Sequence, residues 1–216
     1  MRPRGPRQAA PILVGIAGGS GSGKSWLAEQ LKRRFHPNAL NICLDDFYRD
    51  RSHLSTARRA TINFDHPRAI DWPALEGVLR TLARRLPARC PRYDFKTHSR
   101  LPASKRIRPA RIILLEGLWV LRRPSIRRLL SLSIFLEASN SVRLARRLAR
   151  DLANRGRSAE SVRLQFRSSV QPMHRQFVQP QKRHADLVFK GAFGQDQIDR
   201  IAVVLEGFVA SGAPRS

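Results

Sequence analysis

An apolar run, Ile12–Ala17, leads directly into the segment Gly18-Gly-Ser-Gly-Ser-Gly-Lys-Ser25, and a helix-compatible segment follows it. In the spacing G-x-x-x-x-G-K-S, glycines allow backbone N–H groups and a helix N-terminus to surround a phosphate. Lys24 would reach the β- and γ-phosphates, and the Ser25 hydroxyl would bind Mg²⁺. A Gly/Ser linker would not stand between a strand and a helix. The sequence therefore predicts a nucleotide-phosphate site formed by Gly18, Gly19, Ser20, Gly21, Ser22, Gly23, Lys24, Ser25 and Trp26.

Three carboxylates follow apolar runs of the chain. Asp45 and Asp46 come after Leu40–Leu44, and Glu116 comes after Ile112–Leu115. In an open parallel sheet, ligands bind at the carboxyl ends of the strands. Glu116 is therefore expected to hold Mg²⁺, directly or through water. A carboxylate of the Asp pair could accept the proton of an attacking hydroxyl, although such a pair equally suits a helix cap or a water-mediated metal contact.

The segment Ser141–Asp151 predicts an amphipathic helix. Its positions divide into an apolar stripe of Leu144, Leu148 and Leu152 and a basic stripe of Arg143, Arg147 and Arg150. A bare arginine stripe is more commonly a solvated face. Phosphoryl transfer spreads negative charge over the equatorial oxygens, so a mobile helix that brings arginines over ATP would suit that reaction and exclude water. Arg155-Gly-Arg157 follows directly and predicts the tip of such a lid.

The elements that must position these residues alternate between strands and helices. Five apolar runs predict buried strands: Ile12–Ala17, Leu40–Leu44, Ile112–Leu115, Leu132–Leu136 and Leu187–Phe189. Their alternation with helical segments implies an α/β fold, a parallel sheet with helices on both faces. One helix begins near Asp71, ahead of Pro73, and its expected apolar face is Leu75, Val78, Leu79, Leu82 and Leu86. The long irregular stretches 45–70 and 87–109 predict functional loops, where we expect the substrate.

Composition limits the classes of protein. A chain of 216 residues suits one domain with a mobile subregion. The 41 Lys and Arg residues exceed the 16 Asp and Glu residues, and a net charge of +25 suggests nucleic acid, an anionic surface or anionic ligands as partners. These basic residues are spread along the chain, which favours a solvated surface.

The cysteines and the apolar segments indicate the compartment. Cys43 and Cys90 are the only cysteines, too few for a disulfide framework, which favours a reducing cytosol. The basic stretch Met1–Pro11 precedes no apolar core of signal-peptide length, and no segment reaches the length of a membrane span. We expect a soluble cytoplasmic protein with a flexible basic N-terminus at 1–11, one domain at 12–210 and a flexible tail at 211–216.

Taken together, these residues resemble the uridine kinase family, within the wider group that includes phosphoribulokinase and pantothenate kinase. The resemblance runs from about Ile12 to Gly191. Its most specific pieces, in order, are the phosphate loop, Asp45-x-Phe-Tyr48, Asn63-Phe-Asp-His-Pro67, Pro91-x-Tyr-Asp-Phe95 with His98 and Arg100, Glu116-Gly117, Arg146-Arg-Leu-Ala-Arg-Asp151, Arg155-Gly-Arg157, Gln165, Val170-Gln-Pro-Met-His174, Phe177-Val-x-Pro180 and His184-Ala-Asp186. Several motifs in the correct order are far more specific than any one of them.

The resemblance implies a P-loop NTPase fold with a mobile, Arg-rich helical lid at about 141–170, and transfer of the ATP γ-phosphoryl group to the 5′-hydroxyl of uridine or cytidine. ATP and Mg²⁺ are the implied cofactors, and a homotetramer or dimer is the implied assembly. By motif position the catalytic residues are Asp45 as general base, Lys24, Arg150, Arg155 and Arg157. The substrate-binding residues are Asp65 at the ribose hydroxyls, Tyr93, Phe95 and His98 at the nucleobase, and Arg147, Arg157 and Gln165. The metal-binding residues are Ser25, Glu116 and Asp45.

Two departures keep alternatives open. Leu44-Asp45-Asp46 replaces the Gln-Asp-Ser pattern common in nucleoside kinases, so Asp46 could share or take the role of base. Asp-Asp-Phe is also similar to riboside, glycerate and pantothenate kinases, which makes another small hydroxyl substrate the runner-up. The net charge suggests a different class, a nucleic-acid-binding P-loop ATPase. The absence of Asn-Lys-x-Asp disfavours a GTPase, and the intact Lys24, Ser25, Asp45 and Glu116 disfavour a degenerate kinase retained as a regulator.

Overall fold

A single parallel sheet organises the molecule. The structure, a computed structural model, describes residues 10–60, 62–95, 97–191 and 193–211. The strand order is β2-β7-β1-β8-β9, and every pairing is parallel. The strands are β1 Ile12–Gly18, β2 Ala39–Cys43, β7 Ile112–Gly117, β8 Leu132–Glu137 and β9 Leu187–Lys190. The predicted parallel sheet is confirmed, with strand ends that differ from the expected ones by one or two residues.

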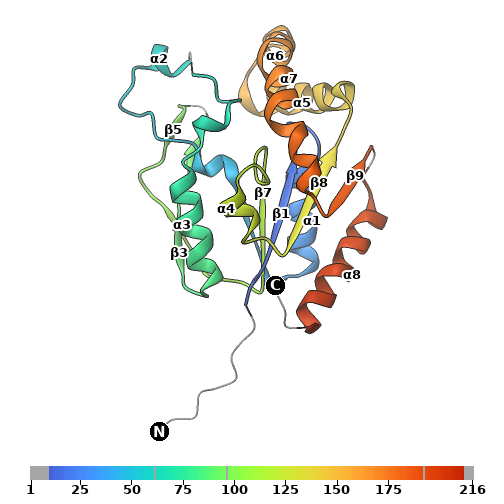
Figure 1. The fold of residues 1–216 in the computed structure, drawn as a ribbon. Helices are drawn as coiled ribbons and strands as arrows, with labels where there is room; N and C mark the ends of the chain where they lie inside the picture. Colours follow the sequence, from blue (N-terminus) through green and yellow to red (C-terminus); the bar gives the residue numbers. More distant parts are fainter. Residues whose placement is uncertain (1–9, 61, 96, 192, 212–216) are drawn as a thin grey trace.

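Helices cover both faces of the sheet (Figure 1). Helices α1 (Lys24–Arg34) and α8 (Gln195–Ser211) pack on the face that includes Ile12, Val14 and Ile16. Helices α3 (Trp72–Ala83) and α4 (Pro124–Arg127) pack on the other face. Successive strand residues point to opposite faces, so a continuous apolar strand serves both cores.

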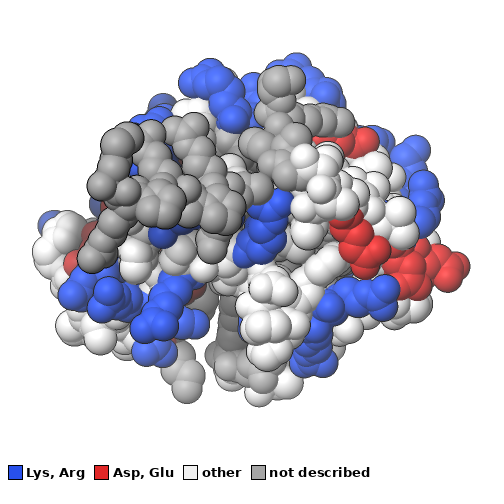
Figure 2. Space-filling model, turned by 90° about the horizontal axis from the view of Figure 1, so that it is seen from below, with Lys and Arg blue, Asp and Glu red and all other residues white. Residues whose placement is uncertain are grey.

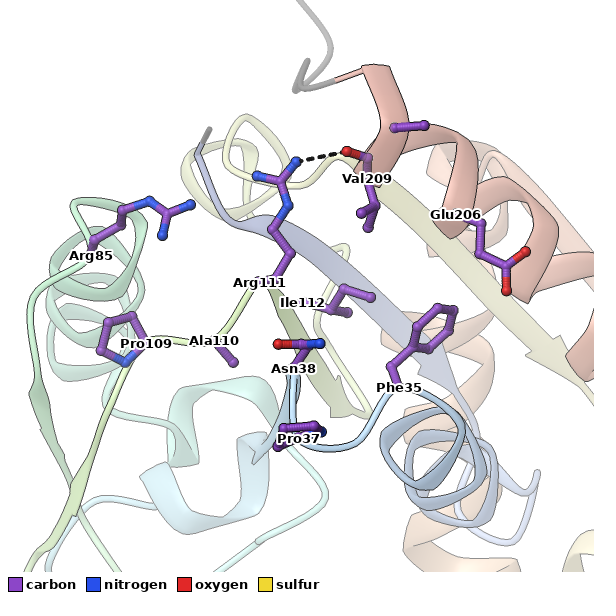
Figure 3. Close-up of a pocket in the computed structure, with 11 residues that line it drawn as sticks. Phe35, Pro37, Asn38, Arg85, Pro109, Ala110, Arg111, Ile112, Glu206 and Val209 are labelled. Carbon is purple, nitrogen blue, oxygen red and sulfur yellow. Dashed lines mark hydrogen bonds between the residues drawn. The ribbon is translucent and has the colours of Figure 1, made fainter. Parts of the chain in front are cut away.

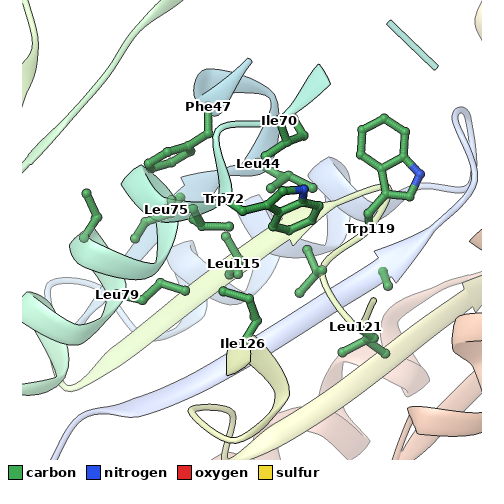
Figure 4. Packing of buried hydrophobic residues seen from close by; sticks show 14 of the residues in the cluster. Leu44, Phe47, Ile70, Trp72, Leu75, Leu79, Leu115, Trp119, Leu121 and Ile126 are labelled. Atoms are coloured by element: carbon green, nitrogen blue, oxygen red, sulfur yellow. The ribbon is translucent and has the colours of Figure 1, made fainter. Parts of the chain in front are cut away.

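Helix α3 starts where the sequence predicts. The Asp71 side chain accepts a hydrogen bond from Ala74 N at 3.2 Å, and a proline occupies the first turn. Leu75 and Leu79 pack with the aromatic rings of this core in Figure 4. The expected place of Leu86 in this apolar face is wrong: the helix ends at Ala83 and Leu86 is 54% exposed. The chain turns away at Arg85, whose φ is 61°.

The two irregular stretches form loops beside this core. They contain the short helix α2 (Thr56–Ala60) and two antiparallel ribbons. The ribbons pair β3 (Ala88–Cys90) with β6 (Lys105–Ile107), and β4 (Tyr93–Asp94) with β5 (Ser99–Arg100). Tyr93, Phe95 and His98 therefore belong to or adjoin one small ribbon.

A run of helical segments stands beyond the carboxyl ends of the strands (Figure 1). It comprises α5 (Asn140–Arg155), α6 (Ala159–Gln165) and α7 (Gln171–Met173), with π-helical turns at Phe166–Val170 and His174–Val178 and a 3-10 turn at Gln179–His184. The predicted amphipathic helix is present. Its arginine stripe, however, is the more deeply buried: Arg143 and Arg147 are 1% and 6% exposed, whereas Leu152 is 48% exposed.

Basic side chains are dispersed on the face of the molecule that Figure 2 shows. Figure 2 views the end of the molecule opposite α5, α6 and α7, where Lys and Arg occur in separate places and form no continuous band. Cys43 and Cys90 are free. In the part of the chain that the structure describes, no helix has both the length and the apolar character that crossing a membrane requires.

Candidate functional site

The phosphate loop joins β1 to α1. Gly21 has a φ of 79°, and a Cβ there would come within 2.5 Å of the Arg143 carbonyl oxygen. Gly23, with a φ of 103°, is the N-cap of α1. The loop is closed by a hydrogen bond from Ser22 N to Gly19 O of 3.1 Å. Glycines in left-handed conformations at the amino end of a buried helix give the backbone the shape of an anion-binding nest.

Lys24 crosses the loop. Its Nζ donates to Gly19 O at 2.9 Å, and the residue is 8% exposed. Burial lowers the pKa of Lys24, while the charges of Glu116 and Asp45 act to raise it. The ammonium group therefore lies close to both predicted carboxylates, as a group that pairs with nucleotide phosphates would.

Ser25 and Glu116 meet at the same end of the loop. Ser25 Oγ donates to Glu116 Oε1 at 2.9 Å, and Glu116 is 4% exposed. Among the described residues no group of three or more His, Cys, Asp and Glu side chains could hold a metal ion. A hydroxyl and one buried carboxylate nevertheless fit Mg²⁺, which takes hard oxygen ligands and completes its shell with water and substrate phosphates.

The neighbouring carboxylates Asp45 and Asp46 face different partners. Both lie in the 3-10 turn Leu44–Phe47 that follows β2. The charge of Asp45 acts on Lys24. The Asp46 carboxylate accepts the backbone N–H of Tyr93, and burial raises its pKa. Asp46 is thus tied to the ribbon β4–β5 by this hydrogen bond, although the charge of Glu116 also acts on it, whereas the charge of Asp45 acts on both Lys24 and Tyr48.

The predicted nucleobase residues lie in one aromatic cluster. The rings of Tyr93 and Phe95 are 5.3 Å apart, and His98 stacks on Phe64 with centroids 4.6 Å apart. Tyr48 contacts Tyr93 at 5.1 Å and donates its hydroxyl to Phe64 O at 3.0 Å. Burial raises the pKa of Tyr93 to about 12, and its buried hydroxyl has no hydrogen-bond partner among the described residues.

Arg147 links the phosphate loop to the predicted ribose site. Its Nη1 donates to Ser20 Oγ at 3.2 Å and its Nη2 donates to Gln165 Oε1 at 2.8 Å. The Asp65 carboxylate accepts from Ser169 Oγ at 2.9 Å, and its charge acts on Arg147. The structure therefore brings three predicted substrate residues together over the loop.

Two more predicted arginines, Arg150 and Arg157, lie beside Asp151, which is fully buried. Arg150 Nε lies 2.8 Å from Asp151 Oδ1, and Arg157 Nη1 lies 3.7 Å from Oδ2. Arg157 also donates to the oxygen of Gln165. The side chain of Arg155 lies outside the described residues. Arg150 and Arg157 are thus held beside Arg147, and among the described residues neither forms a hydrogen bond or an ion pair with the phosphate loop.

Two further features lie apart from this cluster. Trp26, in the first turn of α1, is 46% exposed and meets Phe193 edge-on at 6.1 Å. A groove of about 870 Å³ lies at the amino ends of the strands (Figure 3), where Arg111 Nη2 donates to Val209 O at 3.2 Å. None of the predicted site residues lines this groove.

Sequence reasoning missed two residues of the site. Tyr48 completes the aromatic cluster, and Asp151 pairs with Arg150 and Arg157. Each stands inside a motif already quoted, so the signal was present. Burial was the missing information, because periodicity alone does not show which stripe of α5 faces the loop.

Comparison with known proteins agrees with this geometry. The sequence profile of the phosphoribulokinase/uridine kinase family matches residues 13–196. The chain is 40% identical over 194 residues to a uridine kinase of Brevibacillus brevis, covering 89% of this chain and 91% of that protein. It is 40% identical over 209 residues to a uridine kinase of Chloroflexus aggregans, covering 95% and 100%. Phosphoribulokinase from Rhodobacter spheroides has a similar fold, with a TM-score of 0.61, 21% identity, and coverage of 85% of this chain and 70% of that one. The chain belongs to the phosphoribulokinase/uridine kinase family.

Proposed function

We propose that the protein is an ATP-dependent kinase that transfers the γ-phosphoryl group to the 5′-hydroxyl of uridine or cytidine, giving UMP or CMP. One observation carries the proposal: Arg147 joins the phosphate loop at Ser20 to Gln165 and Asp65, beside the cluster of aromatic rings. In this proposal the ATP site and the nucleoside site therefore adjoin each other, with Arg147 between them. The relatives named uridine kinase, which match nearly the whole chain, support the same class of acceptor.

In this proposal the loop holds the ATP phosphates and Asp45 is the general base. The charge of Asp45 acts on Lys24. Asp45 would accept the proton of the 5′-hydroxyl as that hydroxyl attacks a γ-phosphate held by the loop. Ser25, Glu116 and Asp45 would hold Mg²⁺, which would supply positive charge against the phosphate oxygens. Lys24 and the lid arginines Arg147, Arg150, Arg155 and Arg157 neutralise the charge that develops during transfer.

Recognition of the nucleoside falls to the loops. Asp65 accepts hydrogen bonds from the ribose hydroxyls, while the rings of Tyr93 and Phe95 supply an aromatic surface on which the base packs. His98 has a φ of 53°, in the left-handed region, and its ring stacks on Phe64 beside the other aromatic rings. We infer that His98 hydrogen-bonds the base edge.

The Asp45–Asp46 pair favours one alternative, a kinase of the same family that acts on another small hydroxyl compound. Purified protein with Mg-ATP and a panel of uridine, cytidine, adenosine, nicotinamide riboside, ribulose 5-phosphate, pantothenate and glycerate decides between them. Uridine- or cytidine-dependent ADP release, with the 5′-monophosphate identified by mass, is the expected result. Turnover with another acceptor alone would keep the phosphate chemistry and reassign the substrate.

The partners in this proposal are small molecules, together with further copies of the chain. We propose a homotetramer or dimer, which light scattering on the purified protein checks. The free Cys43 and Cys90 suit the reducing cytoplasm. The dispersed charge of Figure 2 does not favour a nucleic-acid track on that face.

A further inference from the structure

Arg143 is a buried cation at the back of the phosphate loop. It lies in the first turn of α5 and is 1% exposed. Its Nε donates to Ser20 O at 3.1 Å, and its guanidinium packs so closely on Gly19 that a Cβ there would come within 2.5 Å of Nε. A side chain at position 19 would therefore displace the guanidinium of Arg143 from its place against the loop.

The charge of Arg143 is not balanced by a nearby carboxylate in the described part of the chain. The ion pairs made with Asp151 involve Arg147, Arg150 and Arg157, and no Asp or Glu oxygen in that part pairs with the guanidinium of Arg143. Its Nη1 reaches only the neutral Asn140 Oδ1, at 3.4 Å, and its buried Nη2 has no hydrogen-bond partner. Burial lowers its pKa to about 10, so the group remains a cation at neutral pH. Its Cζ lies 5.6 Å from the centre of the Phe166 ring, a cation–π contact. A buried charge that has no carboxylate partner is costly unless another anion pairs with it.

Arg143 and its neighbour Arg146 bind two backbone carbonyl oxygens of the phosphate loop. Ser20 O accepts from Arg143, and Gly21 O accepts from Arg146 at 3.3 Å. Both carbonyl oxygens are therefore turned toward α5. In a phosphate loop the N–H groups must converge on the anion, which requires the carbonyl oxygens to point away from it.

We propose that Arg143 is a positioning residue for nucleotide binding: it holds the Ser20 peptide with its carbonyl toward α5, and its buried charge is completed by the phosphates in the loop. This inference depends on one part of the proposed function, the binding of a nucleotide by the phosphate loop. It does not depend on which molecule accepts the phosphoryl group. Its effect should grow with the number of phosphates at the loop. A residue that merely packs α5 would affect all nucleotides equally.

Calorimetric titration of ADP, a non-hydrolysable ATP analogue and AMP into Arg143→Met tests this. ADP and ATP-analogue affinity should fall by about 10- to 100-fold, the range for a hydrogen bond to a charged group, whereas AMP affinity should fall less than about threefold. Arg143→Lys keeps the charge and loses the planar fork, so it should recover part of the loss. Arg163→Met, which removes an exposed cation from α6, is the matched control and should bind as wild type does.

Unchanged ADP affinity in folded Arg143→Met, or equal losses for all three nucleotides, would overturn the inference. If that variant does not fold, Arg143→Lys decides: the inference requires weaker ADP binding with AMP binding retained. A wild-type protein that binds ADP but phosphorylates no nucleoside would contradict the proposed acceptor alone. A wild-type protein that binds no nucleotide would overturn both proposals.

Discussion

Asp45 and Asp46 are adjacent in the sequence but differ in their neighbours. The charge of Asp45 acts to raise the pKa of Lys24, whereas the Asp46 carboxylate accepts a hydrogen bond from the backbone N–H of Tyr93. If Asp45 is the base, Asp45→Asn should leave ATP binding nearly intact and lower turnover by about two to four orders of magnitude. ADP release and calorimetric ATP binding measure the two quantities.

Asp46→Asn is the matched control, because it makes the same chemical change one residue away. It should weaken the hydrogen bond to the ribbon that carries Tyr93 and so raise the KM for the acceptor more than it lowers kcat. Turnover at the wild-type level in Asp45→Asn would exclude Asp45 as the base and make Asp46 the next candidate.

His174 makes stability depend on pH. Burial, together with the charge of Arg143, lowers the pKa of His174 to about 4 from 6.5, while Gln179, which is hydrogen-bonded to it at 3.1 Å, and the charge of Glu137 act in the opposite direction. Between those values the unfolded chain binds the proton more tightly, so the contribution of His174 is present above pH 6.5 and is lost as the pH falls toward 4.

Urea unfolding between pH 7 and 4 should therefore show a smaller loss of stability for His174→Gln than for the wild-type protein. Parallel pH profiles for the two proteins would show that this histidine does not titrate abnormally.

At the residue scale, spacing predicted the phosphate loop, and the structure places Ser25 on Glu116. The sequence could not separate the roles of Asp45 and Asp46, because both follow the same strand. Their difference arises from the 3-10 turn, which directs successive side chains to different neighbours.

Helix α5 is organised around polar contacts. Asp151 and Arg147 are both buried and lie 3.5 Å apart, and Arg150 and Arg157 adjoin the same carboxylate. Asp151→Asn would leave Arg147 without its buried partner and should destabilise the protein by about 3 kcal/mol, which denaturant unfolding measures.

The control is Glu29→Gln, because Glu29 pairs with Lys32 and Arg33 on an exposed face of α1. Solvent screens such pairs, so the effect should be far smaller. An equal loss in the two variants would mean that Asp151 does not organise the lid.

At the element scale, periodicity predicted that α5 exists but not which side is buried. Apolar residues normally face the core, yet here the guanidinium groups bind loop carbonyls and Asp151 while Leu152 lies exposed. The end of α3 was likewise unpredictable from hydrophobicity, because Leu86 continues the apolar pattern beyond the turn at Arg85.

At the scale of the whole molecule, the alternation of apolar runs and helical segments was sufficient to predict a parallel sheet covered on both faces. The strand order was not predicted, since it depends on crossovers that the local pattern does not encode. The net charge of +25 was equally uninformative about function, because basic residues serve both the buried lid and the scattered surface.

The central claim is that donor and acceptor meet in one site and that the phosphoryl group passes between them. Purified protein is mixed with Mg-ATP and uridine, ADP and UMP are quantified by mass, and 5′-deoxyuridine, which lacks the reacting hydroxyl, is the control. We predict one UMP for each ADP and no transfer to 5′-deoxyuridine. ADP release at the same rate with and without uridine, and without UMP, would contradict the account.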